Sequence, residues 1–280
     1  MSSSYKSSKI ELLMAKFSNL AYKNIRKFKD GTSLFKNREL QDWKYVQLKD
    51  AHIDMKNKAF LAVNNKSQEI VIVFKGSEPL PSFDLENIVN DWWIADLNLV
   101  VGVIPKQFYD SLDFLNTVKK YIDQNGFKDN YKVYMTGHSL GGSVVQLLCS
   151  FEENSFINGY TYNAYGVKHL LKTLENKGVN INQNFSNINN FSVSADLVSN
   201  QNEHIGNIYV VKYNKNFVQT LVAIVFELPK VLVDIPYKIK KSIKYYLNCV
   251  KWTFIKINGH LMNNFISEFN YEKYNNNLRR

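Results

Sequence analysis

Residues 131–149 have the sequence YKVYMTGHSLGGSVVQLLC, which decides the fold. The first six are typical of a short strand and residues 143–149 of a helix, with Gly137-His138-Ser139-Leu140-Gly141 between them. This G-x-S-x-G pattern is a nucleophile elbow, a strained turn that needs residues without bulk on both sides of the serine. Ser139 is therefore the candidate nucleophile. The backbone N–H of Leu140, at the helix N-terminus, is a candidate oxyanion donor.

The surroundings of this motif give it weight. With 12 glycines in 280 residues, a bare G-x-S-x-G arises by chance in roughly one chain in thirty. A strand directly before it and an amphipathic helix directly after it are the context that the motif requires. The alternative is a tight strand-to-helix turn that only packs.

Length and composition favour one α/β domain covering residues 1–280, because 45% hydrophobic residues suffice for a sizeable core. No signal peptide and no run of 18 apolar residues is found, so a cytoplasmic or peripheral membrane protein is expected. A protein exported by a route that needs no signal peptide would show the same sequence features. Two cysteines and the lack of zinc or phosphate-loop motifs predict no metal and no cofactor.

The order of the predicted elements indicates a mainly parallel central sheet with helices on both faces. A capping-box pattern at residues 8–11 opens an amphipathic helix. Residues 70–74 are a β-branched run, typical of a strand buried on both faces. Strands are expected at residues 43–48, 59–63, 69–74, 131–136, 160–164, 191–195 and 207–213, and further helices at residues 108–122, 143–149 and 167–174.

A nucleophilic serine needs a histidine base and a carboxylate, in the chain order serine, acid, histidine for this arrangement. Asp196 ends a predicted strand on the same sheet edge as Ser139, whereas Asp234 lies in a basic segment. His204 follows Asp196 too closely for a crossover and precedes the next strand. His260 follows a glycine in a loop-like stretch, and is the preferred base.

Two further features are open to either a structural or a functional interpretation. Ser77 follows the buried strand at residues 69–74, where it is an oxyanion donor or an ordinary turn serine. Residues 79–93 contain two prolines and end in Trp92-Trp93, a pattern that fits a cover over an apolar cleft or an aromatic pair in the core.

The chain resembles the fungal-type, or class 3, lipases of the α/β-hydrolase fold. The elbow TGHSLGG at residues 136–142 is close to the form in that family. The other similar stretches are VFKGS at 73–77, DWWIADL at 91–97, SADLVS at 194–199, HIGNIYVV at 204–211 and GHLMNNF at 259–265.

This resemblance implies an α/β-hydrolase fold and a set of roles. Ser139 is the nucleophile, His260 its base and Asp196 the acid, with Ser77 and the Leu140 backbone as oxyanion donors. It further implies that residues 79–93 form a lid and that the histidine at the start of HIGNIYVV is structural. The arginine usual before the oxyanion glycine is a lysine here.

A basic insertion at about residues 214–258 departs from the family. Residues 212–256 carry nine lysines against Glu227 and Asp234, a local net charge of +7. Apolar residues recur among the lysines, which suits a basic helix lying on an anionic membrane surface. A helix that packs on the domain and solvates its lysines explains the same pattern.

The sequence thus predicts a serine carboxylic ester hydrolase acting on lipid esters, either a triacylglycerol lipase or a phospholipase of the A1 type. An inactive hydrolase scaffold that binds anionic membranes is the alternative. Nucleic acid is not an expected partner, because the patch lacks arginine and any recognised reading motif. Nothing in the sequence indicates an oligomeric state.

Overall fold

The computed structural model describes residues 4–23, 27–48, 58–77, 104, 106–193, 196, 198–199, 202–211, 265 and 270–273. Within these ranges the chain forms one nine-stranded sheet in the order β1-β9-β8-β7-β6-β5-β4-β3-β2. The strands are β1 (Ser4–Lys6), β2 (Lys44–Val46), β3 (Ala59–Asn64), β4 (Glu69–Phe74), β5 (Lys132–His138), β6 (Ile157–Tyr162), β7 (Ile188–Val193), β8 (Asn207–Val211) and β9 (Asn270–Lys273).

The centre of the sheet, from β4 to β8, is parallel, and antiparallel strands flank it on both sides. The pairing sets His138 of β5 opposite Tyr162 of β6, and Tyr162 opposite Phe191 of β7. The carboxyl ends of these three strands therefore meet at one edge of the sheet, where sites form in α/β folds.

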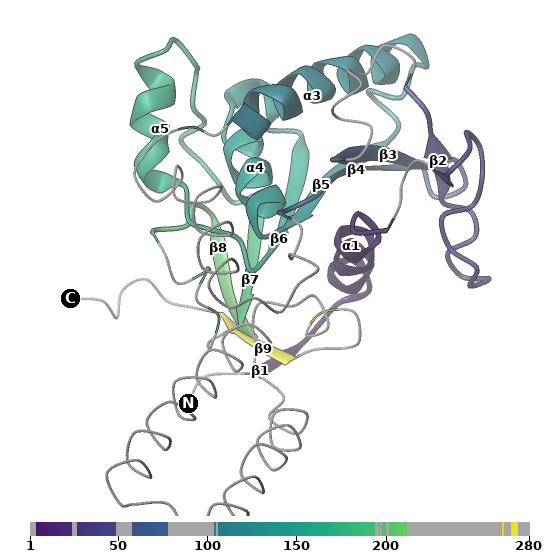
Figure 1. Ribbon diagram of the computed structural model, residues 1–280, viewed down its shortest axis with the longest axis horizontal. Coiled ribbons are helices and arrows are strands. Elements are labelled where there is room, and N and C mark those ends of the chain that lie inside the picture. Colours follow the sequence, from purple (N-terminus) through teal and green to yellow (C-terminus); the bar gives the residue numbers. More distant parts are fainter. Residues whose placement is uncertain are drawn as a thin grey trace, which may run out of the picture.

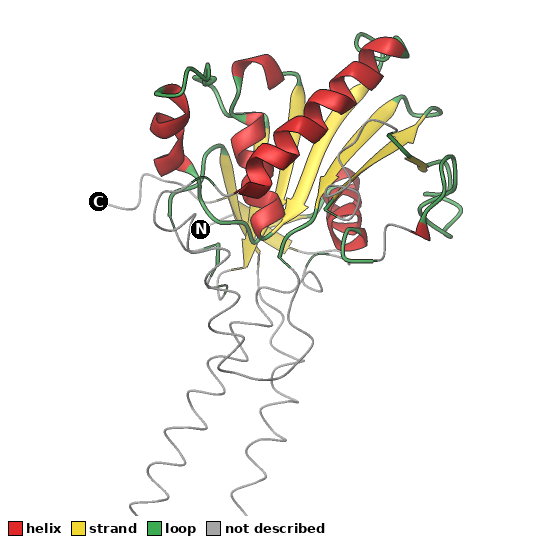
Figure 2. Cartoon of the chain, turned by 45° about the horizontal axis from the view of Figure 1, so that its top comes forward, coloured by secondary structure: helices red, strands yellow, loops and turns green. Residues whose placement is uncertain are grey.

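Helices cover both faces of the sheet, as Figures 1 and 2 show. Helix α1 (Lys9–Leu20) lies on one face, and α3 (Lys106–Gln124), α4 (Leu140–Cys149) and α5 (Lys168–Glu175) lie on the other. This arrangement confirms the predicted α/β-hydrolase fold with a mainly parallel sheet.

Two hydrophobic cores lie on the two faces of the sheet, and β4 contributes to both. Ile70, Ile72 and Phe74 pack under α3 and α4, whereas Val71 and Val73 pack with α1. All five side chains are fully buried. Since burying a Val, Ile or Phe side chain contributes about 1.5–3 kcal/mol, this strand stabilises both layers at once.

Two strands begin three residues earlier than their sequence suggests: β6 starts at Ile157 and β7 at Ile188. Their first residues include asparagines, which usually mark loops. Buried hydrogen bonds offset this preference at Asn190, whose amide oxygen accepts from Thr161 (2.7 Å) and whose nitrogen donates to the Ile205 carbonyl (2.7 Å).

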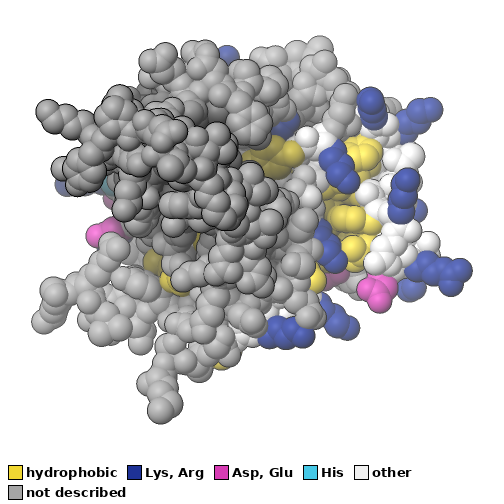
Figure 3. Space-filling view, turned by 60° about the horizontal axis from the view of Figure 1, so that its bottom comes forward, with side chains coloured by type: hydrophobic (Ala, Val, Ile, Leu, Met, Phe, Trp, Pro, Cys, Tyr) yellow, Lys and Arg dark blue, Asp and Glu magenta, His cyan; other side chains and the backbone are white. Residues whose placement is uncertain are grey.

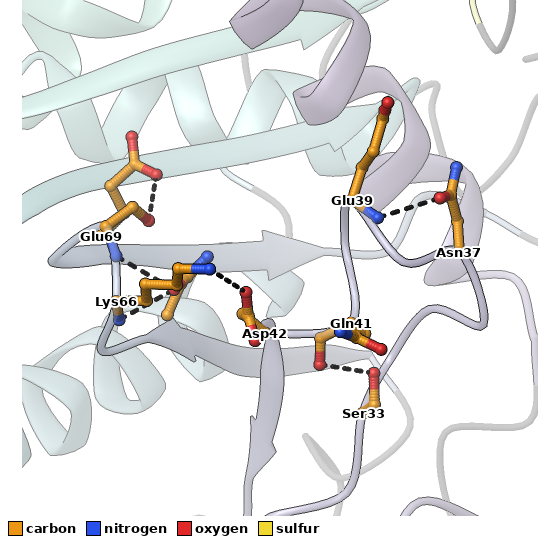
Figure 4. Close-up of polar contacts among 9 residues, drawn as sticks. Ser33, Asn37, Glu39, Gln41, Asp42, Lys66 and Glu69 are labelled. Carbon is orange, nitrogen blue, oxygen red and sulfur yellow. Dashed lines mark hydrogen bonds and ion pairs between the residues drawn. The ribbon is translucent and has the colours of Figure 1, made fainter.

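The segment before β2 is fixed by polar contacts at the opposite end of the sheet (Figure 4). The Ser33 hydroxyl donates to the Gln41 carbonyl (2.8 Å), and the Lys66 ammonium pairs with Asp42 (3.5 Å). Both members of the ion pair are well exposed, so its contribution to stability is small, about 1 kcal/mol at most. These contacts therefore support the structure and involve none of the predicted site residues.

Several sequence predictions fall outside the described residues. They are the basic insertion at 214–258, the lid at 79–93, the DWWIADL stretch and His260. Among the helices that the structure describes, none combines the length and the apolar composition needed to cross a membrane.

Candidate active site

Ser139 lies in the turn between β5 and α4, in a backbone conformation that non-glycine residues rarely adopt. Its φ is 55° and its ψ is −130°. The turn is held by the Ser139 N–H, which donates to the Tyr162 carbonyl (3.0 Å), and by the Ser139 carbonyl, which accepts from Gly142 and Ser143 of α4. Strain of this kind at a buried serine is a feature of functional sites. Leu140 is the first residue of α4, so its N–H belongs to the helix N-terminus.

The elbow glycines are required because backbones approach closely there. A Cβ at Gly137 would overlap the backbone of Gly141, and a Cβ at Gly141 would overlap the carbonyl of Phe74 at the end of β4. The helix N-terminus is therefore packed directly on the strand end that leads to Ser77. The sequence prediction of two bulk-free positions around the serine agrees with this geometry.

The turn that follows β4 is in contact with Ser139. A Cβ built on Gly76 would lie 2.5 Å from the His138 carbonyl oxygen and 3.1 Å from the Ser139 Cβ. Ser77 is the next residue and is half-buried. The structure thus brings the elbow and the predicted oxyanion turn together, although they are about 60 residues apart in the chain.

Sequence reasoning missed the residues that support this contact, Tyr22 and His138. The Tyr22 hydroxyl hydrogen-bonds to Nδ1 of His138 (2.7 Å), and the rings meet edge to face with centroids 5.6 Å apart. The ammonium of Lys75 lies 5.9 Å from the Tyr22 ring centre, within reach of a cation–π interaction. A tyrosine after a packing helix carries no pattern that would have singled it out.

Asp196 follows β7 by three residues and is completely buried. Its N–H donates to the Val193 carbonyl (2.9 Å), and its Oδ2 accepts from the Ser199 N–H (2.7 Å). Strands β5 and β7 are separated by β6, so the two strand ends lie about 10 Å apart. An imidazole ring with its two hydrogen bonds spans most of such a gap.

His204 lies between β7 and β8, with an oxygen atom close to each of its ring nitrogens. Nε2 is 2.9 Å from the Ser199 carbonyl, and Nδ1 is 3.3 Å from Oε1 of Gln146 on α4. Burial lowers the pKa of His204 below its ordinary value, although the Ser199 carbonyl and the charge of Asp196 act in the opposite direction.

His260 lies outside the described residues, but Phe265, five positions later, is described. Its side chain is fully buried in the core on the α1 face and packs edge to face on Tyr162, with ring centroids 5.0 Å apart. The carbonyl of Tyr162 accepts the hydrogen bond from Ser139. Phe265 is thus anchored against a residue that holds the elbow.

No group of three or more His, Cys, Asp or Glu residues in the described part of the chain is arranged to hold a metal ion. Cys149 is buried in α4, and burial raises the pKa of its thiol far above the usual range. A thiol that stays protonated is a poor nucleophile and a poor metal ligand. The chemistry available at the described edge of the sheet is that of Ser139 and its neighbours.

Comparisons with known proteins give a family match and a set of similar folds. A model described as "Phospholipase-like: Tle-like phospholipase domain" matches residues 13–233. A Rhizomucor miehei lipase propeptide complex is similar at 22% identity, covering 76% of this chain and 70% of that chain, with a TM-score of 0.46. A mutant of MDLA from Penicillium cyclopium is 18% identical, with 74% and 80% covered and a TM-score of 0.48. No curated protein matches the chain.

Proposed function

Because the chain belongs to the family of Tle-like phospholipase domains and is a lipid ester hydrolase, we propose that it is a phospholipase of the A1 type. In this proposal Ser139, His260 and Asp196 form a catalytic triad, and hydrolysis proceeds through an acyl-enzyme. The observation that carries the proposal is the backbone of Ser139, held at φ 55° on the N-terminus of α4 beside Gly76.

The mechanism follows from the roles of these groups. His260 takes the proton of the Ser139 hydroxyl as its oxygen attacks the ester carbonyl carbon. The N–H of Leu140 and the Ser77 residue stabilise the oxyanion of the tetrahedral intermediate. The intermediate collapses, and the lysophospholipid leaves with the proton from His260. Water, deprotonated by His260, then attacks the acyl-enzyme, and the fatty acid is released as His260 returns the proton to the Ser139 oxygen. Asp196 stabilises each imidazolium.

The anchoring of Phe265 supports His260 as the base. Five residues of extended chain span at most about 18 Å, and Phe265 packs on Tyr162, which is bonded to the Ser139 N–H. The chain between Phe265 and His260 is therefore long enough for His260 to act on Ser139 in the proposed triad. His204 is the weaker candidate, because its Nε2 already donates to the Ser199 carbonyl and its Nδ1 faces Gln146.

The charge distribution favours an anionic phospholipid surface over a neutral fat droplet as the site of action. Residues 212–256 carry a net charge of +7, and each lysine near an anionic membrane contributes about 1 kcal/mol. Lysine and arginine side chains also gather around a hydrophobic area on the described part of the face in Figure 3. We therefore infer a peripheral membrane location, with the anionic bilayer as both substrate and partner.

Hydrolysis of anionic phosphatidylglycerol liposomes and of a triacylglycerol emulsion, measured side by side, tests the proposal. Wild type is expected to prefer the liposomes, with release of the sn-1 fatty acid. Ser139→Ala is expected to lower kcat about a millionfold and Asp196→Asn about 10⁴-fold.

The other outcomes discriminate between the alternatives. Preference for the emulsion would assign a triacylglycerol lipase, and equal activity in Asp196→Asn would refute that residue as the acid. Salt-sensitive liposome binding without turnover of either lipid or of short-chain esters would indicate an inactive membrane-binding scaffold.

A further inference from the structure

The orientation of the acid depends on a short turn. Asp196 and Ser199 are both buried, and the Ser199 N–H donates to Oδ2 of Asp196 at 2.7 Å. A charge-assisted hydrogen bond of this length fixes the direction of the carboxylate. The position of the Ser199 backbone thus determines where the other carboxylate oxygen points.

His204 holds that backbone from the opposite side. Its Nε2 lies 2.9 Å from the Ser199 carbonyl. A carbonyl oxygen only accepts, so Nε2 must carry a proton and donate it. Ser199 is therefore held at both ends of its backbone, by its N–H to Asp196 and by its carbonyl to His204.

The chain at His204 is in turn joined to helix α4, because the N–H of the next residue, Ile205, donates to Gln146. Gln146, which is fully buried in α4, lies 3.3 Å from Nδ1 of His204 and donates to the Tyr165 carbonyl at 2.8 Å. The Ile205 N–H donates to the same glutamine oxygen at 3.5 Å. The glutamine follows Ser139 by seven residues in the chain, and α4 starts at the residue after the serine.

We propose that His204 is a positioning residue for catalysis: it links the Asp196–Ser199 turn to helix α4, and so sets the carboxylate relative to Ser139. This inference rests on the proposed triad but is not part of it, because His204 touches neither Ser139 nor the substrate in the mechanism above. The side chain acts on the acid through the backbone of Ser199.

Two variants separate positioning from general support of the fold. His204→Leu removes the donor, whereas His204→Gln places an amide N–H where Nε2 was. We expect His204→Leu to lower kcat on phosphatidylglycerol liposomes about 10²-fold, as for a misplacement of about 1 Å, with KM within about twofold of wild type. His204→Gln is expected to recover most of this loss. His169→Leu, at an exposed histidine of α5, is the control and should match wild type.

A pH profile gives a readout that a purely structural role would not change. A well-placed carboxylate raises the pKa of the catalytic imidazole, so the acid limb of kcat/KM should move to lower pH in His204→Leu. Circular dichroism checks that the variants are folded. If the leucine variant fails to fold, His204→Asn replaces it, because its shorter amide does not reach the Ser199 carbonyl, and the same loss is expected.

The proposal is overturned if folded His204→Leu or His204→Asn keeps the wild-type kcat and acid limb, or if Tm falls without a change in either. Hydrogen exchange at the Ser199 amide adds a measurement that does not depend on activity, and protection should fall about tenfold in the leucine variant. If His204→Leu loses protection at Ser199 but turnover does not depend on Ser139, the proposed triad is refuted and the link made by His204 is not. Wild-type protection in the variant would refute the link itself.

Discussion

Replacing Gly76 with alanine tests the contact between the oxyanion turn and the nucleophile. The added Cβ would lie 2.5 Å from the His138 carbonyl oxygen, 2.6 Å from the Tyr22 hydroxyl and 3.1 Å from the Ser139 Cβ. The tyrosine can rotate away from the methyl group. The carbonyl cannot, because His138 belongs to β5, which is paired with a neighbour on each side.

The size of the effect follows from these distances. An ordinary contact starts at 3.4 Å, so the new methyl group and the carbonyl must separate by about 0.9 Å. The shift falls on residues 76–77, which carry the proposed oxyanion donor. Since a misplacement of about 1 Å costs about 10²-fold in rate, we expect Gly76→Ala to lower kcat about 100-fold with little change in KM.

The assay is hydrolysis of phosphatidylglycerol liposomes, with circular dichroism to verify folding. Gly126→Ala is the matched control, because Gly126 has φ +66° and no atom of the described residues lies within 4 Å of the place that a Cβ would take there. Alanine at this position should cost about 1–2 kcal/mol of stability and leave kcat unchanged. A folded Gly76→Ala variant with wild-type kcat would show that this turn takes no part in stabilising the transition state.

Four further predictions address other parts of the molecule. Ser77→Ala should lower kcat about 10² to 10³-fold at constant KM, measured by steady-state kinetics. Phe265→Ala should lower the free energy of unfolding by about 3–5 kcal/mol in urea titrations, because a buried ring is lost. Ser8→Ala should cost about 1 kcal/mol in the same titration, since it removes the capping box of α1. Burial lowers the folded-state pKa of His204 below 6.5, so stability should fall as pH drops from about 6.5 toward that lower pKa, and His204→Gln should flatten this dependence.

Elements with strong local signals were predicted from the sequence. The capping box at Ser8 and Glu11 is present, and β4 occupies the predicted residues 69–74 with both faces buried. The predicted strands at 59–63 and 69–74 are present and are joined by a turn in which the Asn64 side chain accepts the N–H groups of Lys66 and Ser67. In each case the signal and the interaction involve residues close together in the chain.

Elements that depend on distant partners were not predicted. Strands β1 and β9 pair with each other, Ser4 with Glu272 and Lys6 with Asn270, and β9 also pairs with β8. Neither segment has the alternating or continuous apolar pattern of an isolated strand. Their strand character comes from edge positions beside an existing sheet, which no local pattern reveals.

The candidate site shows the same division. The elbow was predicted because its requirements fall on neighbours of Ser139, and Asp196 was predicted as the acid because it ends a predicted strand. Tyr22 and the hydrogen bonds of His204 were missed, since their partners come from other elements of the fold. The sequence rejected His204 as a base by its position in the chain, and that argument gives no hint of a role through Ser199.

These distant contacts explain why the elbow can hold its strained serine. The turn is enclosed by the end of β4 through Gly76, by the residues after α1 through the bond from Tyr22 to His138, and by β6 through the carbonyl of Tyr162. A residue at φ 55° costs of order 1–3 kcal/mol, and it persists only where several neighbours fix the backbone. Because Gly76 leads to Ser77 and Tyr162 packs against Phe265, the contacts that maintain the strain also join Ser139 to the proposed oxyanion turn and to a residue five positions after the proposed base.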